Sequence, residues 1–151
     1  MPKVKDLMTV NLFVCREGQT LDRVEEFMKK GRIRHIPVVD EKGALAGLLT
    51  HRDLLQVCIS SFQAGSEIGL KRFLQGKKIG EIMRRSVITT TPDTDLRDAA
   101  SLMLHHKLGC LPVVDGTQLV GIITEADFLN LAWEALDSGR LEAEVDQDPG
   151  A

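Results

Sequence analysis

Residues 36–53 read IPVVDEKGALAGLLTHRD, and residues 111–127 read LPVVDGTQLVGIITEAD. The two stretches align from end to end: Pro37 matches Pro112, and Asp53 matches Asp127. The second copy lacks one residue between Asp115 and Gly121, and a turn tolerates such a change of length. The chain therefore contains an internal repeat, which is the first feature to look for in any sequence.

The repeat extends on both sides of the quoted stretches, because Met8 matches Met83 and Leu21 matches Leu96. Each copy has a short opening strand, an amphipathic helix, two strands joined by a turn and a second helix after its threonine. This order predicts an α/β fold of two β-α-β-β-α units. We expect each unit to have one apolar face and the two faces to share one core.

The repeats divide the chain into four parts. We expect repeat 1 at 3–58, a linker with a short helix at 59–78, repeat 2 at 79–134 and a tail at 135–151. The tail is rich in acidic residues and poor in apolar ones, so it is expected to be disordered. An acidic interaction segment is the alternative reading of this tail.

Composition excludes several classes of protein. A chain of 151 residues with 43% apolar residues can bury a core without disulfides. Its three cysteines form no Cys-x-x-Cys pair, which favours reduced thiols in the cytoplasm and no metal site. The net charge of −3 and the 4% aromatic content argue against nucleic-acid binding. No apolar run is long enough to cross a membrane, and the first residues have no apolar stretch, so no signal peptide is expected.

The paired motifs resemble two CBS domains in tandem, an arrangement called a Bateman module. The resemblance rests on Asp-Leu-Met and Glu-Ile-Met, on the two Pro-Val-Val-Asp strands, and on Gly-Leu-Leu-Thr-His-Arg-Asp and Gly-Ile-Ile-Thr-Glu-Ala-Asp. It implies two repeats packed with pseudo-two-fold symmetry through their sheets. It also implies an adenine ligand (AMP, ADP, ATP or S-adenosylmethionine) in clefts between the repeats, and a homodimer. No catalytic residue and no required cofactor are implied.

The Thr-x-x-Asp sequences at the second helix of each copy are the strongest site candidates: Thr50, Asp53, Thr124 and Asp127. A helix N-terminus offers N–H groups to a phosphate, and an ionised carboxylate can accept hydrogen bonds from ribose hydroxyls. The resemblance gives these residues the same roles, so two binding sites are expected. The alternative is that each pair only caps its helix as a capping box.

The remaining candidates are assigned by the resemblance to the phosphate or to the adenine. Basic side chains near the first Thr-x-x-Asp would hold phosphate, unless they only form a solvated face: Arg34, His51 and Arg52. Residues at the opening strands and before each proline would line the adenine cleft: Val14, Cys15, His35, Ile36, Pro37, Thr89, Thr90, Cys110, Leu111 and Pro112. Core packing is the alternative for Ile36 and Leu111.

The sequence thus predicts a regulatory module that senses an adenine nucleotide and signals to an unidentified partner by a conformational change. A scaffold with the same fold but no ligand is the alternative. An enzyme is not expected, because the sequence shows no nucleophile–base arrangement, phosphate-binding loop or metal cluster.

Overall fold

The computed structural model describes residues 1–61 and 67–140. Its helices and strands follow the order of the repeat, with one additional helix between the two copies. The elements are α1 (Val4–Leu7), α2 (Leu21–Gly31), β1 (His35–Val39), β2 (Leu45–Thr50), α3 (His51–Ser61), α4 (Glu67–Gln75), α5 (Ile79–Ile82), α6 (Leu96–His106), β3 (Cys110–Asp115), β4 (Gln118–Thr124) and α7 (Glu125–Asp137).

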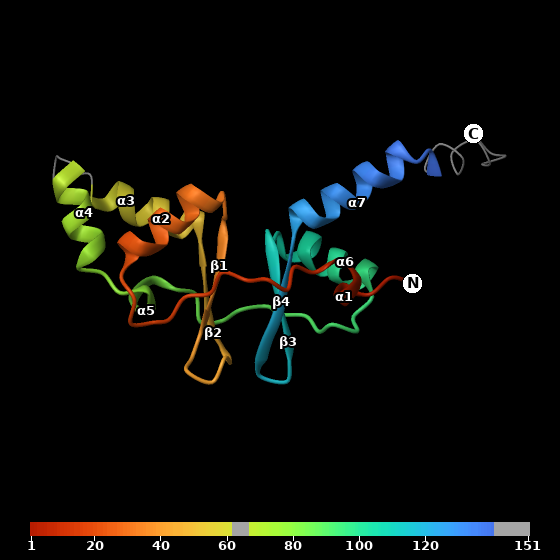
Figure 1. Cartoon of the computed structure of the whole chain (residues 1–151), viewed down its shortest axis with the longest axis horizontal. Coiled ribbons are helices and arrows are strands. Elements are labelled where there is room, and N and C mark those ends of the chain that lie inside the picture. Colours follow the sequence, from red (N-terminus) through yellow and green to blue (C-terminus); the bar gives the residue numbers. More distant parts are fainter. Residues whose placement is uncertain (62–66, 141–151) are drawn as a thin grey trace.

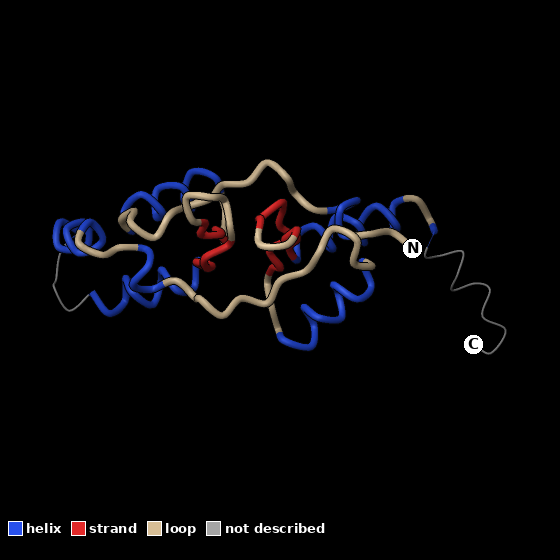
Figure 2. Tube along the Cα trace, turned by 90° about the horizontal axis from the view of Figure 1, so that it is seen from below, coloured by secondary structure: helices blue, strands red, loops and turns tan. Residues whose placement is uncertain are grey.

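Two antiparallel hairpins, β1–β2 and β3–β4, form the centre of the molecule. Figures 1 and 2 show them side by side, with the helices of each repeat on the outer sides. Their registers correspond, since Val38 faces Gly47 and Val113 faces Gly121, and each hairpin has an irregularity directly after that valine. At their turns the hairpins contact each other through a bridge between Ala44 and Gln118. The predicted α/β fold of two repeats is therefore confirmed.

The opening segment of each repeat differs from the expected strand. It forms only an isolated parallel bridge to the neighbouring hairpin, between Cys15 and Val38 in the first repeat and between Thr90 and Val113 in the second. Two hydrogen bonds hold each segment, such as Cys15 N–H to Pro37 O at 3.0 Å and Val39 N–H to Cys15 O at 2.9 Å. An isolated pairing of this length aligns the segment without extending the sheet.

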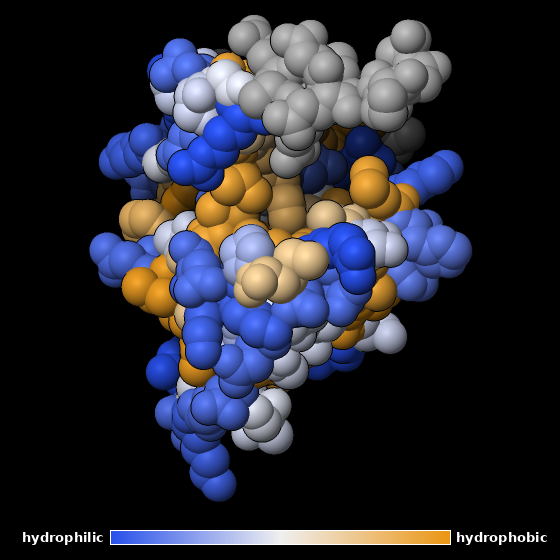
Figure 3. Space-filling view, turned by 90° about the vertical axis from the view of Figure 1, so that its right-hand side faces the viewer, coloured by the Kyte–Doolittle hydropathy of each residue, from blue (hydrophilic) through white to orange (hydrophobic). Residues whose placement is uncertain are grey.

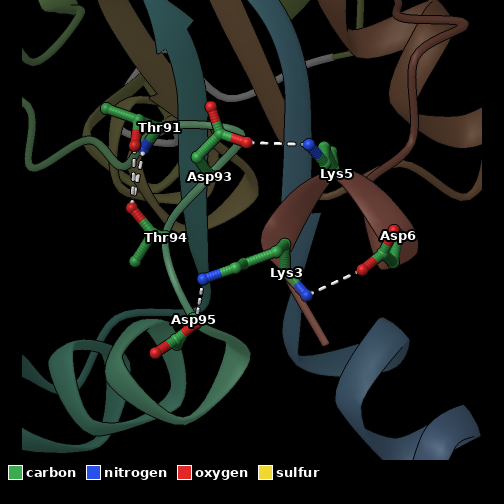
Figure 4. A network of polar contacts seen from close by, with 7 residues as sticks. All are labelled: Lys3, Lys5, Asp6, Thr91, Asp93, Thr94 and Asp95. Carbon is green, nitrogen blue, oxygen red and sulfur yellow. Dashed lines mark hydrogen bonds and ion pairs between the residues drawn. The ribbon is translucent and has the colours of Figure 1, made fainter. Parts of the chain in front are cut away.

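The short helix that opens each repeat packs on the other repeat. Val4 of α1 is fully buried in the core of the second repeat, whereas Ile79 of α5 is fully buried in the core of the first. Polar contacts hold α1 in this position, including the ion pairs of Lys3 with Asp95 and Lys5 with Asp93 (Figure 4). Each half of the molecule therefore combines residues from both copies of the repeat, which ties the halves together.

A glycine in each hairpin allows this exchange. The chain that follows α5 pairs with β2 through Leu48 and Arg84, and the chain that follows α1 pairs with β4 through Thr9 and Ile122. A Cβ on Gly47 would lie 2.7 Å from Arg84 O, and one on Gly121 would lie 2.7 Å from the sulfur of Met8. Only glycine leaves room for the crossing chain at these positions.

The apolar residues form two separate cores rather than the single shared core expected. One core contains Leu21, Ile36 and Leu49, and the other contains Leu96, Leu111 and Ile123. Among the described residues, a third and smaller cluster combines Leu48 of the first repeat with Cys110 and Ile122 of the second. The expectation fails because the largest apolar side chains of each hairpin face the helices that cover it, including one exchanged from the other repeat, rather than the other hairpin.

The two halves differ most in their last helices. Helix α4 extends the first core through Leu74, in the segment where the sequence predicts a short helix. Helix α7 runs to Asp137, beyond the expected end of the repeat, and projects away from the body (Figure 1). Residues 141–151, most of the expected disordered tail, lie outside the described residues. Among the described helices, none is long and apolar enough to cross a membrane.

Candidate functional site

A cleft of about 460 Å³ lies between the repeats and is lined by residues from both. The first repeat contributes the segment before β1 and the beginning of α3. The second contributes Arg84 and the segment between α6 and β3. The lining residues are Arg34, His35, Leu48, Thr50, His51, Arg52, Leu55, Arg84, Lys107, Leu108, Gly109, Cys110 and Glu125. Four of these carry a fixed positive charge and one a negative charge, so the cleft favours an anion.

Most N–H groups in the first turn of α3 are already paired. His51 N–H donates to Arg34 O at 2.7 Å, and Asp53 N–H donates to the Thr50 hydroxyl at 3.2 Å. Arg52 N–H is the only first-turn donor left without a partner in the described chain. Helix α7 shows the same pattern, because Glu125 N–H donates to Gly109 O at 3.1 Å. A phosphate would therefore have to be held mainly by side chains, contrary to the expectation of several free N–H groups.

Both Thr-x-x-Asp sequences form the predicted capping arrangement. Asp53 Oδ2 accepts hydrogen bonds from the Thr50 hydroxyl at 2.8 Å and from Thr50 N–H at 3.3 Å. Asp127 Oδ2 accepts from Thr124 N–H at 2.8 Å and from the Thr124 hydroxyl at 3.2 Å. These contacts fix each carboxylate at a helix N-terminus, where the helix dipole stabilises its negative charge.

Asp53 has a second partner, which Asp127 lacks in the described chain. Arg84 Nη2 donates to Asp53 Oδ1 at 3.0 Å, and Arg84 Nε donates to Asp53 Oδ2 at 3.2 Å. Partial burial alone would raise the pKa of Asp53, but the hydrogen bonds from Arg84 and Thr50 outweigh burial and hold that pKa below its usual value. The carboxylate is therefore ionised at neutral pH.

His35 and Gly109 meet across the boundary between the repeats. A Cβ on Gly109 would lie 2.7 Å from His35 Nε2, so the second repeat has glycine where the first has Arg34. Burial lowers the pKa of His35, although the charge of Glu125 opposes this shift. The ring is therefore neutral at pH 7. Burial also raises the pKa of the Cys110 thiol to about 12, which keeps that thiol protonated.

The structure brings only part of the predicted site into this cleft. Arg34, His35, Thr50, His51, Arg52 and Cys110 line it, and Asp53 reaches it through Arg84. Other candidates lie outside the lining: Val14, Cys15, Ile36, Pro37, Thr89, Thr90, Leu111, Pro112, Thr124 and Asp127. Of these, Ile36 and Leu111 are fully buried in the two cores, as the packing alternative requires.

Sequence reasoning missed Arg84 and gave no role in the site to Lys107. Arg84 stands where the first repeat has Thr9, so the repeat alignment could have shown an additional cation at this position. Its contact with Asp53 could not be read from the sequence, because the two residues lie in different repeats and meet only through the chain exchange.

Comparison with known proteins agrees with this architecture. The CBS domain pattern matches residues 4–60 and 79–134. The CBS domain-containing protein YhcV of Bacillus subtilis is 34% identical over 131 residues, which are 84% of this chain and 83% of YhcV.

Two crystal structures are also similar. That of AcuB from Vibrio cholerae has a TM-score of 0.75 and 34% identity, with 99% of each chain covered. That of CBSX2 in complex with AMP has a TM-score of 0.74 and 30% identity, with 89% of this chain and 98% of CBSX2 covered. The chain therefore belongs to the CBS-domain family, as a tandem pair of CBS domains.

Proposed function

We propose that this CBS pair is a regulatory module that binds an adenine nucleotide between its repeats. The observation that supports this most strongly is the cleft itself, in which cations from both repeats surround a space of about 460 Å³. A cavity of this size is in the range of small-molecule sites. CBSX2, of similar fold and 30% identity, was crystallised with AMP.

The charges suggest how such a ligand would lie. Arg34 and Arg52 enter the cleft from the first repeat and Lys107 from the second, so phosphate groups would lie between them. Arginine suits this role because its planar guanidinium can donate two parallel hydrogen bonds to phosphate oxygens. Glu125 of the second repeat also lines the cleft and would repel phosphate. The phosphates would therefore point toward the first repeat.

The less polar lining would receive the adenine. Leu48, Leu55 and Leu108 provide apolar surface, and His35 and Cys110 lie beside them. Asp53 and Asp127 would accept hydrogen bonds from ribose, one in each of two sites. The opening-strand candidates Val14, Cys15, Thr89 and Thr90 remain predictions for the adenine clefts.

A ligand in this position would act as a regulator because it touches both repeats. In the described chain, a small apolar cluster of Leu48, Cys110 and Ile122 lies between the two cores, so a ligand that spans both repeats can alter their relative packing. A nucleotide that prefers one packing would shift the population toward it, and a partner protein would detect the exposed surface. We expect no turnover of the nucleotide. We expect the protein in the cytoplasm, where its thiols would stay reduced.

We also propose that the module is a homodimer. Helices α3 and α7 expose apolar side chains at matching repeat positions, Leu55 with Leu129 and Ile59 with Trp133. Trp133 is 64% exposed, and apolar surface is visible at the α7 end of the molecule (Figure 3). A second copy presenting the same face would cover these residues with two-fold symmetry. Sedimentation of the wild type and of Trp133→Glu tests this: the variant should be monomeric, and a monomeric wild type would contradict the dimer.

Ligand binding is tested by thermal shift and calorimetry with adenosine, AMP, ADP, ATP and S-adenosylmethionine. A ligand that binds only the native state raises Tm. The double variant Asp53→Asn, Asp127→Asn should lose binding, whereas Asp6→Asn, which alters the exposed cap of α1, should retain it. Arg34→Ala should weaken the binding of ATP more than the binding of adenosine. If the wild type binds none of these compounds, the ligand-free scaffold is the better reading.

A further inference from the structure

The backbone of Arg84 is fixed beside the cleft. Its N–H donates to Leu48 O and its carbonyl accepts from Leu48 N–H, both at 2.9 Å. From this position the side chain reaches the N-terminus of α3 and forms the ion pair with Asp53. The guanidinium side is open, with 56% of the Arg84 side chain exposed, whereas only 14% of the Asp53 side chain is exposed. Arg84 can therefore leave the pair toward the cleft, while Asp53 stays in place.

The ion pair with Arg84 leaves the Asp53 carboxylate with few free acceptor positions for hydrogen bonds from ribose hydroxyls. Its Oδ2 accepts from the Thr50 hydroxyl, Thr50 N–H and Arg84 Nε, and its Oδ1 accepts from Arg84 Nη2. A carboxylate has about four lone-pair positions, and a ribose diol needs one on each oxygen in a shared plane. The diol can approach both oxygens only when the guanidinium has moved.

The second repeat provides the comparison. Thr9 occupies the position of Arg84, with the same two backbone hydrogen bonds, here to Ile122 at 2.9 and 3.0 Å. Asp127 has the same capping contacts as Asp53, and no cation lies within ion-pair distance of it among residues 1–61 and 67–140. The two aspartates therefore differ mainly in this one neighbour.

Other charges in the cleft favour release of Arg84 by an anion. Arg34, Arg52 and Lys107 also line the space, and Glu125 is the only carboxylate among the lining residues. A phosphate between these cations would compete with Asp53 for the guanidinium, which binds phosphate with the same paired geometry. The Arg84 side chain is 56% exposed, so a phosphate in the cleft can reach its guanidinium while the ion pair with Asp53 is still formed.

We propose that Arg84 makes the Asp53 site selective for ligands that carry phosphate. The phosphate takes the guanidinium from Asp53, and the released carboxylate then accepts the ribose hydroxyls. A ligand without phosphate must break the ion pair without offering the Arg84 guanidinium a new anionic partner, so it binds this site poorly. This inference rests on the proposed function and makes phosphate and ribose binding cooperative at Asp53 and independent at Asp127.

The test compares Arg84→Thr, which introduces the residue of the second repeat, with Arg85→Thr. Arg85 carries the same charge next in sequence but pairs with Glu17 and Gly80 O. The probe is inorganic tripolyphosphate, with binding measured by calorimetry and the Asp53 carboxyl followed by NMR titration. Arg84→Thr should weaken the binding of tripolyphosphate about tenfold, as expected for a lost hydrogen-bonded charge pair. Arg85→Thr should leave this affinity unchanged.

In the wild type, tripolyphosphate should also raise the pKa of Asp53, because the guanidinium leaves it. In Arg84→Thr that pKa should start higher and respond less. The proposal is overturned if tripolyphosphate fails to bind, binds equally to both variants, or leaves the Asp53 titration unchanged. Failure of the proposed function gives a different result: no adenine compound binds, whatever the response to tripolyphosphate.

Discussion

The two repeats share their hairpins and helix caps but differ around their second helices, α3 and α7. The differences lie in the helix that follows α3 and in the side chain beside the capping aspartate. Each has the same β-strand register, the same Thr-x-x-Asp cap and an opening helix placed on the other half. In the described part of the chain, only the first repeat has a helix such as α4 against its core, and only its capping aspartate pairs with an arginine. The shared residues therefore maintain the fold, and the residues that differ change the packing and the charge around each capping aspartate.

The largest expected effect concerns α4, which only the first half has. Leu74 is 1% exposed and belongs to the first core, whereas Leu104 on α6 of the second repeat is 81% exposed. Leu74→Ala should cost about 2–5 kcal/mol of the free energy of unfolding, as for other buried leucines. Leu104→Ala should change that free energy by less than about 0.5 kcal/mol. Urea unfolding of both variants measures this, and equal losses would show that α4 is not part of the core.

The repeat made much of this architecture predictable. Short continuous apolar runs around Pro37 and Pro112 indicated the strands, and the glycine-containing turns indicated hairpins. The opening segments misled the prediction, because residues near Cys15 and Thr90 have strand-like composition but make only one bridge each. The separation into two cores also escaped prediction, since periodicity shows which face is apolar and not what covers it.

The site was predictable only where the residues lie within one repeat. Thr50 and Asp53 are three residues apart, so their cap follows from local geometry. The contact of Arg84 with Asp53 depends on where the chain after α5 crosses β2, which is a long-range property. The same holds for His35 against Gly109, a contact between residues of different repeats.

A medium effect is expected from the capping threonines, which both repeats share. Thr50→Ala and Thr124→Ala should each cost about 1 kcal/mol, the usual loss for a helix cap. The losses should agree closely because the hydrogen bonds are alike in the two copies. The serine variants, which keep the hydroxyl, should restore most of the stability. Urea midpoints decide the comparison, and a loss confined to one repeat would show that only that cap stabilises its helix.

The smallest effect concerns Arg84 and depends on pH. Asp53 has a folded-state pKa below its unfolded value, so the stability it provides is present above the unfolded pKa and is lost as pH falls through the folded pKa. Arg84→Thr should therefore lower the free energy of unfolding at pH 7 by about 0.5 kcal/mol, as for an ion pair in which one partner is half-exposed. Below the folded pKa of Asp53, the variant and the wild type should be equally stable.

The reverse substitution tests whether the arginine alone accounts for the difference between the repeats. Thr9→Arg places a guanidinium on the same backbone bridge in the second repeat, beside a carboxylate that is capped in the same way. In urea unfolding at neutral pH, the variant should gain about the free energy of unfolding that Arg84→Thr loses. If its stability does not change, the position of α7 keeps the carboxylate out of reach. The two halves would then differ in helix placement as well as in one side chain.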